Sequence, residues 1–206
     1  MEIIVVHGRA GAGKSTHCRS LSEKGFGDKN FVQHISAGEK LRAIRSDEMK
    51  SQYEDIIRSS LDEPIPNAIV NSLIFESIKV TESNHGIVLI DDFPRHKEAV
   101  EGFCEKIFNS GHQLLGTIAM SIPLDISINR VENRGIRKGE RIVGDNLSDF
   151  ATHRYALDYE TTSFAIDALS RLAPVENIDA SGTLEETYNL FVHSVGRLVL
   201  SSANFL

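Results

Sequence analysis

The sequence predicts an α/β fold built on one doubly wound, parallel sheet of five strands. Short apolar runs recur along the chain, and the stretches between them carry the 3.6-residue period of amphipathic helices. Regular alternation of strands and helices makes the strands of such a sheet parallel. The chain has 206 residues, 41% of them hydrophobic, which suits one domain with a full core. The expected strands are Glu2–His7, Phe31–Ile35, Gly86–Asp91, Gln113–Ser121 and Val175–Ile178.

Composition and charge exclude several classes of protein. The formal net charge of −7 disfavours an extended nucleic-acid surface, which is normally basic. The two cysteines, Cys18 and Cys104, have neither metal-type spacing nor a disulfide framework, and both are expected to be small buried residues. No apolar run approaches the roughly 18 residues that span a bilayer. No targeting leader is expected, because the first residues already read as a strand. We therefore expect a cytoplasmic protein without membrane or nucleic-acid partners.

The stretch after the first strand matches a phosphate-binding loop, or P-loop. Residues 8–15 read G-R-A-G-A-G-K-S and fill every fixed position of the G-x-x-x-x-G-K-[ST] pattern. The glycines let backbone N–H groups approach phosphate oxygens, Lys14 reaches the β- and γ-phosphates, and the Ser15 hydroxyl coordinates Mg2+. A dinucleotide-binding turn fits worse, because Thr16 stands where that pattern needs a third glycine. The candidate phosphate-binding residues are Gly8, Gly11, Ala12, Gly13, Lys14, Ser15 and Thr16.

Helices are expected directly after the P-loop and again after the second strand. The first covers Lys14–Lys24 and points the positive end of its dipole at the bound anion. Ser36 and Glu39 have the spacing of a capping box, which starts another helix with Arg42 in its second turn. The stretch Ser46–Lys79 is helical and amphipathic, with one break at residues 63–66. Because one crossover requires less helix than this, residues 36–80 are interpreted as an insertion able to close over a ligand.

An acidic residue stands at the end of the third expected strand. Asp91 follows the apolar run Val88–Ile90, and a carboxylate at such a position beside a P-loop holds Mg2+ through its water shell. Arg95 lies four residues further along the chain. The alternative is that Asp91 caps the next helix, a role that Asp92 could also take.

Basic residues gather in one region of this acidic chain. A helix is expected from Pro123 to about Arg134, and its end and the following glycine-containing loop carry Arg130, Arg134, Arg137, Lys138 and Arg141. Arg130 and Arg134 are four residues apart and share a helix face. Arg130, Arg134 and Arg141 are expected around a migrating phosphate, whereas Arg137 and Lys138 are interpreted as solvated surface residues. A further helix expected over Ser148–Leu172 carries Arg154.

Three further motifs resemble one enzyme family over nearly the whole chain. Residues 35–42 read I-S-A-G-E-K-L-R, similar to S-[TA]-G-[DE]-x-L-R, and residues 89–95 read L-I-D-D-F-P-R, close to L-I-D-G-F-P-R. Residues 178–182, I-D-A-S-G, complete the set. Together with the P-loop, these motifs resemble those of the nucleoside monophosphate kinases of the adenylate kinase and UMP-CMP kinase superfamily.

This resemblance implies a monomeric P-loop kinase domain over residues 1–206 that uses ATP and Mg2+ and binds small-molecule nucleotides. Its parts would be a core of residues 1–35, 81–134 and 147–206, a nucleoside monophosphate (NMP)-binding insertion at 36–80 and a short lid at 135–146. The core would be doubly wound around the five strands. Closure of the insertion and the lid would exclude water from the reacting phosphates.

The resemblance also implies roles for individual residues. Lys14 would hold the donor phosphates, with Mg2+ on Ser15 and, through water, on Asp91. The residues matching the arginines that neutralise the moving γ-phosphoryl group are Arg134, Arg141 and Arg154. Arg130 and the backbone around Gly182 would flank the donor base. The expected acceptor site consists of Ser36, Ala37, Arg42, Ile65, Arg95 and Ala99, with Arg42 and Arg95 on the acceptor α-phosphate.

Several departures from the family pattern leave alternatives open. Asp92 replaces a glycine, and Ala99 stands where the family has a base-reading Asn or Gln, so its side chain cannot form that hydrogen bond. The sequence after Arg141 differs from the usual lid, which leaves Arg137 as the other candidate for the lid arginine. Ala37 is typical of the UMP-CMP form, so UMP or CMP is the expected acceptor. Adenylate kinase, and a catalytically weak nucleotide-binding relative, are the alternatives; a switch-type GTPase lacks support, because no N-K-x-D motif is present.

Overall fold

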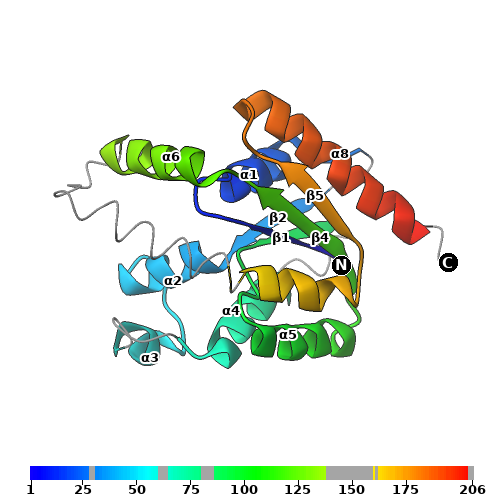
Figure 1. Ribbon diagram of the computed structural model, residues 1–206. Helices are drawn as coiled ribbons and strands as arrows, with labels where there is room; N and C mark the ends of the chain where they lie inside the picture. The colour runs from blue at the N-terminus through cyan, green and yellow to red at the C-terminus, as the bar shows by residue number, and fades with distance from the viewer. Residues whose placement is uncertain (28–30, 60–64, 80–85, 138–159, 161, 204–206) are drawn as a thin grey trace.

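The strands form the single parallel sheet that the sequence predicts. The computed structural model describes residues 1–27, 31–59, 65–79, 86–137, 160 and 162–203 (Figure 1). Every strand pair is parallel, and the strand order is β2-β3-β1-β4-β5. Consecutive β1 and β2 therefore flank β3, which is the crossover pattern of a doubly wound sheet. The strands are β1 (Glu2–Gly8), β2 (Val32–Ser36), β3 (Ile87–Asp91), β4 (Gln113–Ser121) and β5 (Val175–Asp179).

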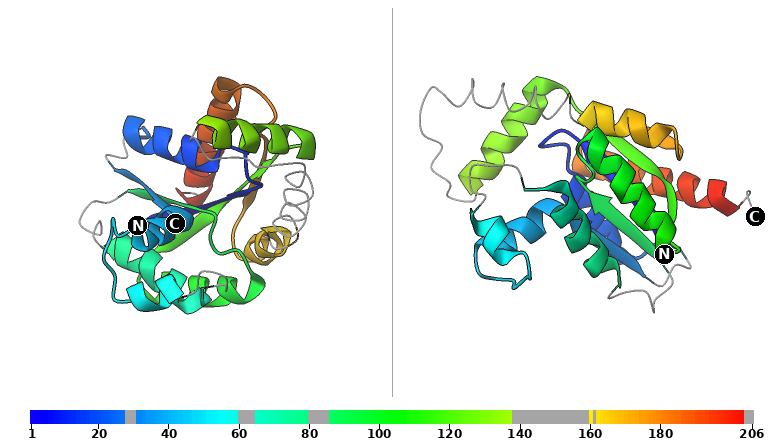
Figure 2. Two further views of the ribbon diagram at one scale, coloured as in Figure 1. Left: turned by 90° about the vertical axis from the view of Figure 1, so that its left-hand side faces the viewer. Right: turned by 90° about the horizontal axis from the view of Figure 1, so that it is seen from below.

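Helices cover both faces of this sheet. On one face, α1 and α8 pack on the strands through an apolar cluster that includes Cys18, Leu21 and Phe191. On the other face, α4, α5 and the helical residues 162–170 pack through a second apolar cluster. The two views of Figure 2 show these helices and the sheet from other sides. The helices are α1 (Lys14–Lys24), α2 (Ala37–Arg45), α3 (Glu54–Ser59), α4 (Asn67–Lys79), α5 (Lys97–Asn109), α6 (Leu124–Arg137) and α8 (Leu184–Ala203).

The helical region between β2 and β3 has a small core of its own. Ile44 of α2, Ile57 of α3, and Ile69 and Leu73 of α4 are buried together there. Residues 46–53 form turns, bends and irregular backbone instead of the helix expected from Ser46 onward. The backbone N–H groups of Glu48 and Met49 both bond back to the carbonyl of Ala43, which ends the regular helical hydrogen bonding. No helix within the described ranges is long and apolar enough to cross a membrane.

Other boundaries differ from the sequence-based expectation by a few residues. Helix α6 continues to Arg137, three residues beyond the expected end, so residues 135–137 of the expected lid are helical. The rest of that lid, residues 138–146, lies outside the described residues. Within the expected helix Ser148–Leu172, residues 162–170 are helical and residues 171–172 form a turn. The N-cap of α5 is His96, so neither Asp91 nor Asp92 takes the capping role considered above.

Helix α8 was not assigned from the sequence, although a local signal for it exists. Thr183 and Glu186 form a capping box: Thr183 Oγ1 accepts from the Glu186 backbone N–H at 3.2 Å, and the Glu186 carboxylate accepts from the Thr183 backbone N–H at 2.9 Å. This T-x-x-E spacing before an apolar helical stretch is a typical helix start. The same box orients the loop that follows β5.

Candidate functional site

One cavity of about 680 Å³ lies at the carboxyl ends of β1 and β3. Such a position, beyond the strand ends of an open parallel sheet, is where α/β folds bind ligands. The cavity joins the P-loop to the start of α2 and to the segment after β3. Its lining includes Ala10–His17, Ser36, Gly38, Arg42, Asp91, Asp92, Arg95, Arg130, Gly182, Thr183, Leu184 and Thr187, together with Gly8.

The P-loop has the geometry of a phosphate cradle. Gly11 and Gly13 take left-handed backbone conformations, with φ of 82° and 89°. A Cβ atom at Gly13 would lie 2.9 Å from Nε2 of His17, and a Cβ at Gly8 would lie 2.5 Å from the carbonyl oxygen of Met120. Lys14 closes the loop, because its Nζ donates to the carbonyls of Gly8 at 2.6 Å and Arg9 at 3.2 Å. All seven predicted phosphate-binding residues line the cavity, so the residues present fit a bound polyphosphate.

Asp91 is buried at the end of β3, on the face of the sheet covered by α1. The register of the sheet pairs it with Ser36 of β2 and Val6 of β1. Its carboxylate accepts hydrogen bonds from His34 Nε2 at 2.7 Å and from the Ser36 hydroxyl at 3.4 Å. Burial alone would raise the pKa of Asp91, but hydrogen bonds from His34 and Ser15 hold that pKa below its usual value. The oxygens of Ser15 and Asp91 are the kind of donors that Mg2+ prefers.

Asp92 places a second carboxylate inside the cavity. Its Oδ1 lies 3.8 Å from Nζ of Lys14 and 3.7 Å from Nε of Arg95. The backbone is left-handed here, with φ of 62°, a conformation that glycine adopts freely and aspartate tolerates at a cost. The carboxylate thus stands between the two cations that the sequence assigns to the donor and acceptor phosphates.

The side of the cavity next to α2 and the segment after β3 presents arginines and a capped helix. Arg42 and Arg95 both line it, and Gly38 leaves room for Arg42, since a Cβ at Gly38 would lie 3.2 Å from one of its guanidinium nitrogens. Ser36 caps α2 by accepting from the backbone N–H of Glu39 at 3.3 Å. The Glu39 carboxylate accepts a hydrogen bond from Arg19 of α1 at 2.7 Å.

Three predicted acceptor residues do not line the cavity. Ala37 and Ala99 are buried in the apolar cluster on the α4 and α5 face, Ala99 with only 1% of its surface exposed. Ile65 is partly buried and packs against both that cluster and the small core of the helical region. That any of the three contacts an acceptor base therefore stays a prediction.

Arg130 ties the P-loop to the loop after β5. Its guanidinium donates to four backbone carbonyls: Gly11 at 3.3 Å, Ala180 at 2.7 Å, Ser181 at 3.1 Å and Gly182 at 2.8 Å. Arg130 and Gly182 thus lie side by side in the lining of the cavity, and that they flank a donor base stays a prediction. The contacts give this arginine a positioning role for both loops.

The remaining predicted arginines cannot be placed in the cavity. Arg134 and Arg137 belong to α6, but their side chains are not among those described. Lys138, Arg141 and Arg154 lie outside the described residues. Their expected roles at a migrating phosphoryl group stay predictions.

Several cavity residues were missed from the sequence. His17 of α1 and the segment Thr183–Leu184, with Thr187, line the cavity. The capping box of α8 was a usable sequence signal for Thr183, Leu184 and Thr187. No local sequence pattern indicates that His17 lines the cavity. His7 lies fully buried before the P-loop, and burial lowers its pKa to about 4. Neither of its ring nitrogens has a hydrogen-bond partner within the described part of the chain.

Comparison with known proteins adds independent information. A protein family described as AAA domain matches residues 7–148 of the chain. UMP-CMP kinase of Rattus norvegicus is 29% identical over 191 residues, which cover 90% of this chain and 92% of the relative. UMP-CMP kinase of Homo sapiens is 28% identical over 192 residues, covering 91% and 93%. Adenylate kinase of Mycobacterium sp. (strain MCS) is 25% identical over 194 residues, covering 94% and 99%.

Proposed function

The chain belongs to the AAA domain family and is a nucleoside monophosphate kinase, and hence a phosphotransferase. From this premise we propose that it transfers the γ-phosphoryl group of ATP to UMP or CMP. The observation that carries the proposal is that the P-loop, Arg42 and Arg95 line one cavity. A donor phosphate on the P-loop and an acceptor phosphate on these arginines would meet there. Phosphoryl transfer depends mainly on holding the two reactants in reacting geometry and on stabilising the charge of the migrating group.

The donor half would use groups that the fold already orients. Lys14 and the backbone N–H groups of the P-loop would bind the β- and γ-phosphates, and Arg130 would hold the loop around Gly182 beside the donor base. Ser15 and Asp91 would hold Mg2+, Asp91 through water. When bound, Mg2+ neutralises phosphate charge and aligns the donor.

The acceptor half would bind the α-phosphate of the NMP through Arg42 and Arg95. We further propose that residues 36–80 form the NMP-binding insertion and 135–146 the lid, with Arg134, Arg141 and Arg154 on the transferred group. Fixed positive charge costs no reorganisation during the reaction, so these arginines would lower the barrier by electrostatic stabilisation. Asp92 opposes this arrangement, because its carboxylate lies within 4 Å of both Lys14 and Arg95.

The choice of a pyrimidine rests on two supports. Ala37 is the residue typical of the UMP-CMP form, and relatives of that name cover about nine tenths of the chain. AMP is the second candidate, because an adenylate kinase is similar over 94% of the chain. Ala99 offers no side-chain hydrogen bond to any base.

A coupled ADP-release assay tests the proposal. Purified full-length protein receives ATP and Mg2+ with AMP, CMP, UMP, GMP or dTMP in parallel reactions, and the Lys14→Met variant serves as the control for contaminating kinases. We expect UMP or CMP to give the highest kcat/KM. A preference for AMP would make the protein an adenylate kinase, and ATP binding without turnover of any acceptor would contradict the proposed activity.

A further inference from the structure

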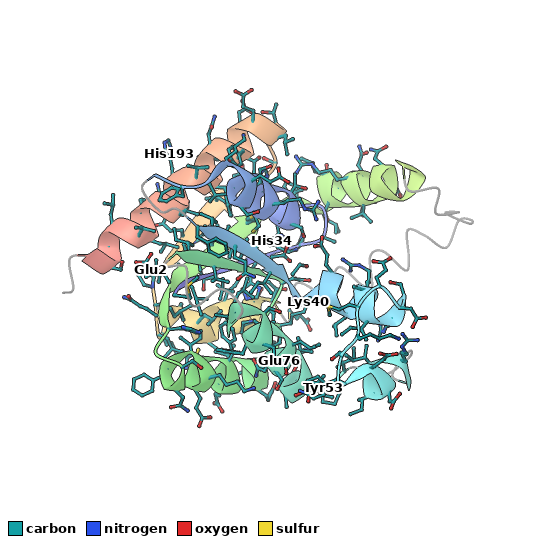
Figure 3. All side chains as sticks on the ribbon, turned by 180° about the vertical axis from the view of Figure 1, so that it is seen from behind. Glu2, His34, Lys40, Tyr53, Glu76 and His193 are labelled. Atoms are coloured by element: carbon teal, nitrogen blue, oxygen red, sulfur yellow. The ribbon has the colours of Figure 1, made fainter. Side chains whose placement is uncertain are left out.

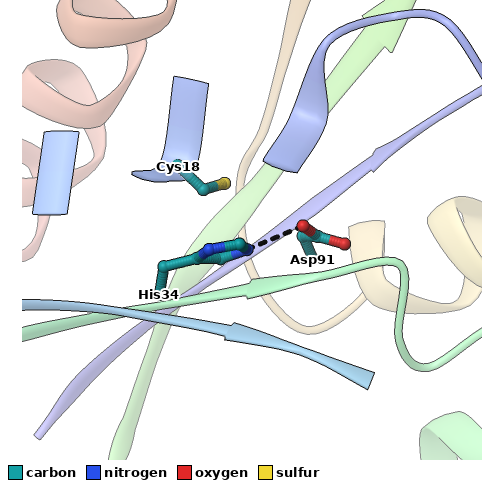
Figure 4. A group of neighbouring side chains, drawn as sticks. All are labelled: Cys18, His34 and Asp91. Carbon is teal, nitrogen blue, oxygen red and sulfur yellow. Dashed lines mark hydrogen bonds and ion pairs between the residues drawn. The ribbon is translucent and has the colours of Figure 1, made fainter. Parts of the chain in front are cut away.

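Three metal-binding side chains from three different elements meet behind the P-loop. They are Cys18 of α1, His34 of β2 and Asp91 of β3 (Figure 4). Their ligand atoms, one sulfur, one ring nitrogen and one carboxylate oxygen, all lie within 4.8 Å of one another. Figure 3 places His34 on β2 beneath α1, far from the exposed His193 on α8. The cluster is thus interior to the fold.

The sheet and α1 bring these side chains together by simple geometry. His34 pairs in register with Leu89, two residues before Asp91, so the side chains of His34 and Asp91 point to the same face of the sheet. Cys18 lies one turn after Lys14 on α1, which covers that face. Cys18 is completely buried, Asp91 is 2% exposed, and the side chain of His34 is 8% exposed.

The donor set is that of a transition-metal site. Thiolate and imidazole are ligands of Zn2+, and a carboxylate commonly completes the set, whereas Mg2+ binds all-oxygen sites. Zn2+ ligand bonds are about 2.0–2.3 Å long. Ligand atoms that already lie within 4.8 Å of one another need only small side-chain movements to reach one ion.

We propose that Cys18, His34 and Asp91 form a binding site for Zn2+ or another thiophilic divalent cation, and that its occupation inhibits the enzyme. On binding, the Cys18 thiol releases its proton to solvent. His34 binds through Nε2 in its Nδ1–H tautomer, which replaces the hydrogen bond to Asp91 with a bond to the metal. No electrons are transferred.

The inhibition follows from the position of Asp91. Without a metal, the Asp91 carboxylate accepts hydrogen bonds from His34 and from the Ser36 hydroxyl. A hydrogen bond from Ser15 of the P-loop also helps to lower the pKa of Asp91. Zn2+ would withdraw the carboxylate from these partners. The expected inhibition rests on the proposed function, in which Ser15 and Asp91 hold Mg2+. The binding of Zn2+ to the three side chains does not depend on that function.

A metal titration of the reduced full-length protein tests the site without any substrate. Zn2+ affinity is measured against a competing chelator, and Co2+ serves as a spectroscopic probe, because a thiolate ligand gives a sulfur-to-cobalt charge-transfer band. The variant Cys18→Ser removes the thiolate, and Cys104→Ser, on α5, is the matched control. We expect one ion per chain in the unmodified protein and in Cys104→Ser. In Cys18→Ser, affinity should fall at least 10-fold and the band should be lost.

The opposite results would overturn the proposal. They are no charge-transfer band in the unmodified protein, or equal Zn2+ affinity in Cys18→Ser. Should Cys18→Ser fail to fold, His34→Asn is the second variant, and it must also lose the ion. In the kinase assay, Zn2+ should inhibit the unmodified protein and Cys104→Ser but not Cys18→Ser. Zn2+ binding in a protein that phosphorylates no NMP would contradict the proposed function and leave the metal site standing.

Discussion

The proposed donor and acceptor halves of the cavity are built differently. The donor half is organised by the backbone: Lys14 donates to two P-loop carbonyls, and Arg130 donates to four carbonyls in two loops. The acceptor half depends on side-chain charge, with Arg95 more than one third exposed and facing the Asp92 carboxylate. Backbone N–H groups recognise any polyphosphate, whereas base selection needs polar side chains. The difference predicts a protein that is strict about phosphates and loose about the acceptor base.

Removing the donor lysine should have the largest effect. Lys14→Met leaves the P-loop without its cation, so we expect kcat to fall by roughly 10²- to 10³-fold, the loss typical of one charge-stabilising group. The thermal midpoint should change little. The matched control is Lys97→Met on α5, an exposed lysine outside the cavity. An unchanged kcat in Lys14→Met would remove the basis for assigning the donor half.

Arg95→Ala should act on the acceptor half alone. A charge-assisted hydrogen bond contributes about 2–3 kcal/mol, so kcat/KM for the NMP should fall by roughly 30- to 150-fold. The affinity for ATP should stay within about twofold, as measured by nucleotide titration. Arg171→Ala, which removes an exposed arginine paired with Asp167, is the control. A loss confined to ATP affinity would show that Arg95 acts on the donor and would contradict its proposed role on the acceptor phosphate.

Replacing Asp92 should strengthen nucleotide binding in both proposed halves of the cavity. Without its carboxylate, Lys14 and Arg95 are freed for phosphate, and we expect KM for both nucleotides to fall by roughly fivefold, about 1 kcal/mol. Asp92→Gly removes the charge and relaxes the left-handed backbone, whereas Asp92→Asn removes the charge and keeps the shape. Equal KM values in these two variants identify charge as the cause. A lower kcat at unchanged KM would instead show that Asp92 takes part in the reaction.

The smallest change in activity is expected from Ala99→Asn. Because Ala99 is buried among apolar side chains, the new amide should lower the free energy of unfolding by about 1–3 kcal/mol. The ratio of kcat/KM for CMP over AMP should change by less than about threefold. Chemical denaturation and the kinase assay measure the two effects. A tenfold change in this ratio would show that residue 99 reads the base after all.

Local sequence signals were sufficient for the framework of this protein. All five strands were predicted within one residue at each end, since apolar runs bounded by polar residues are read without knowledge of neighbours. The P-loop was predicted from eight consecutive residues. Helix α8 was missed although its capping box is an equally local signal. The non-helical segment at residues 46–53 was mistaken for helix, because an amphipathic pattern does not show where backbone hydrogen bonds reverse the chain.

The sequence by itself therefore determined the α/β class, the P-loop and the family. Only the tertiary structure decided which distant residues share a site. The order β2-β3-β1 and its register put His34 and Ser36 on Asp91, and the left-handed turn at Asp92 brings its carboxylate near Lys14, 78 positions earlier. The packing of α5 buries Ala99, which the motif alone assigned to the acceptor site. Periodicity and motifs depend on neighbours along the chain, whereas register, burial and charge pairing arise between elements that the chain brings together only on folding.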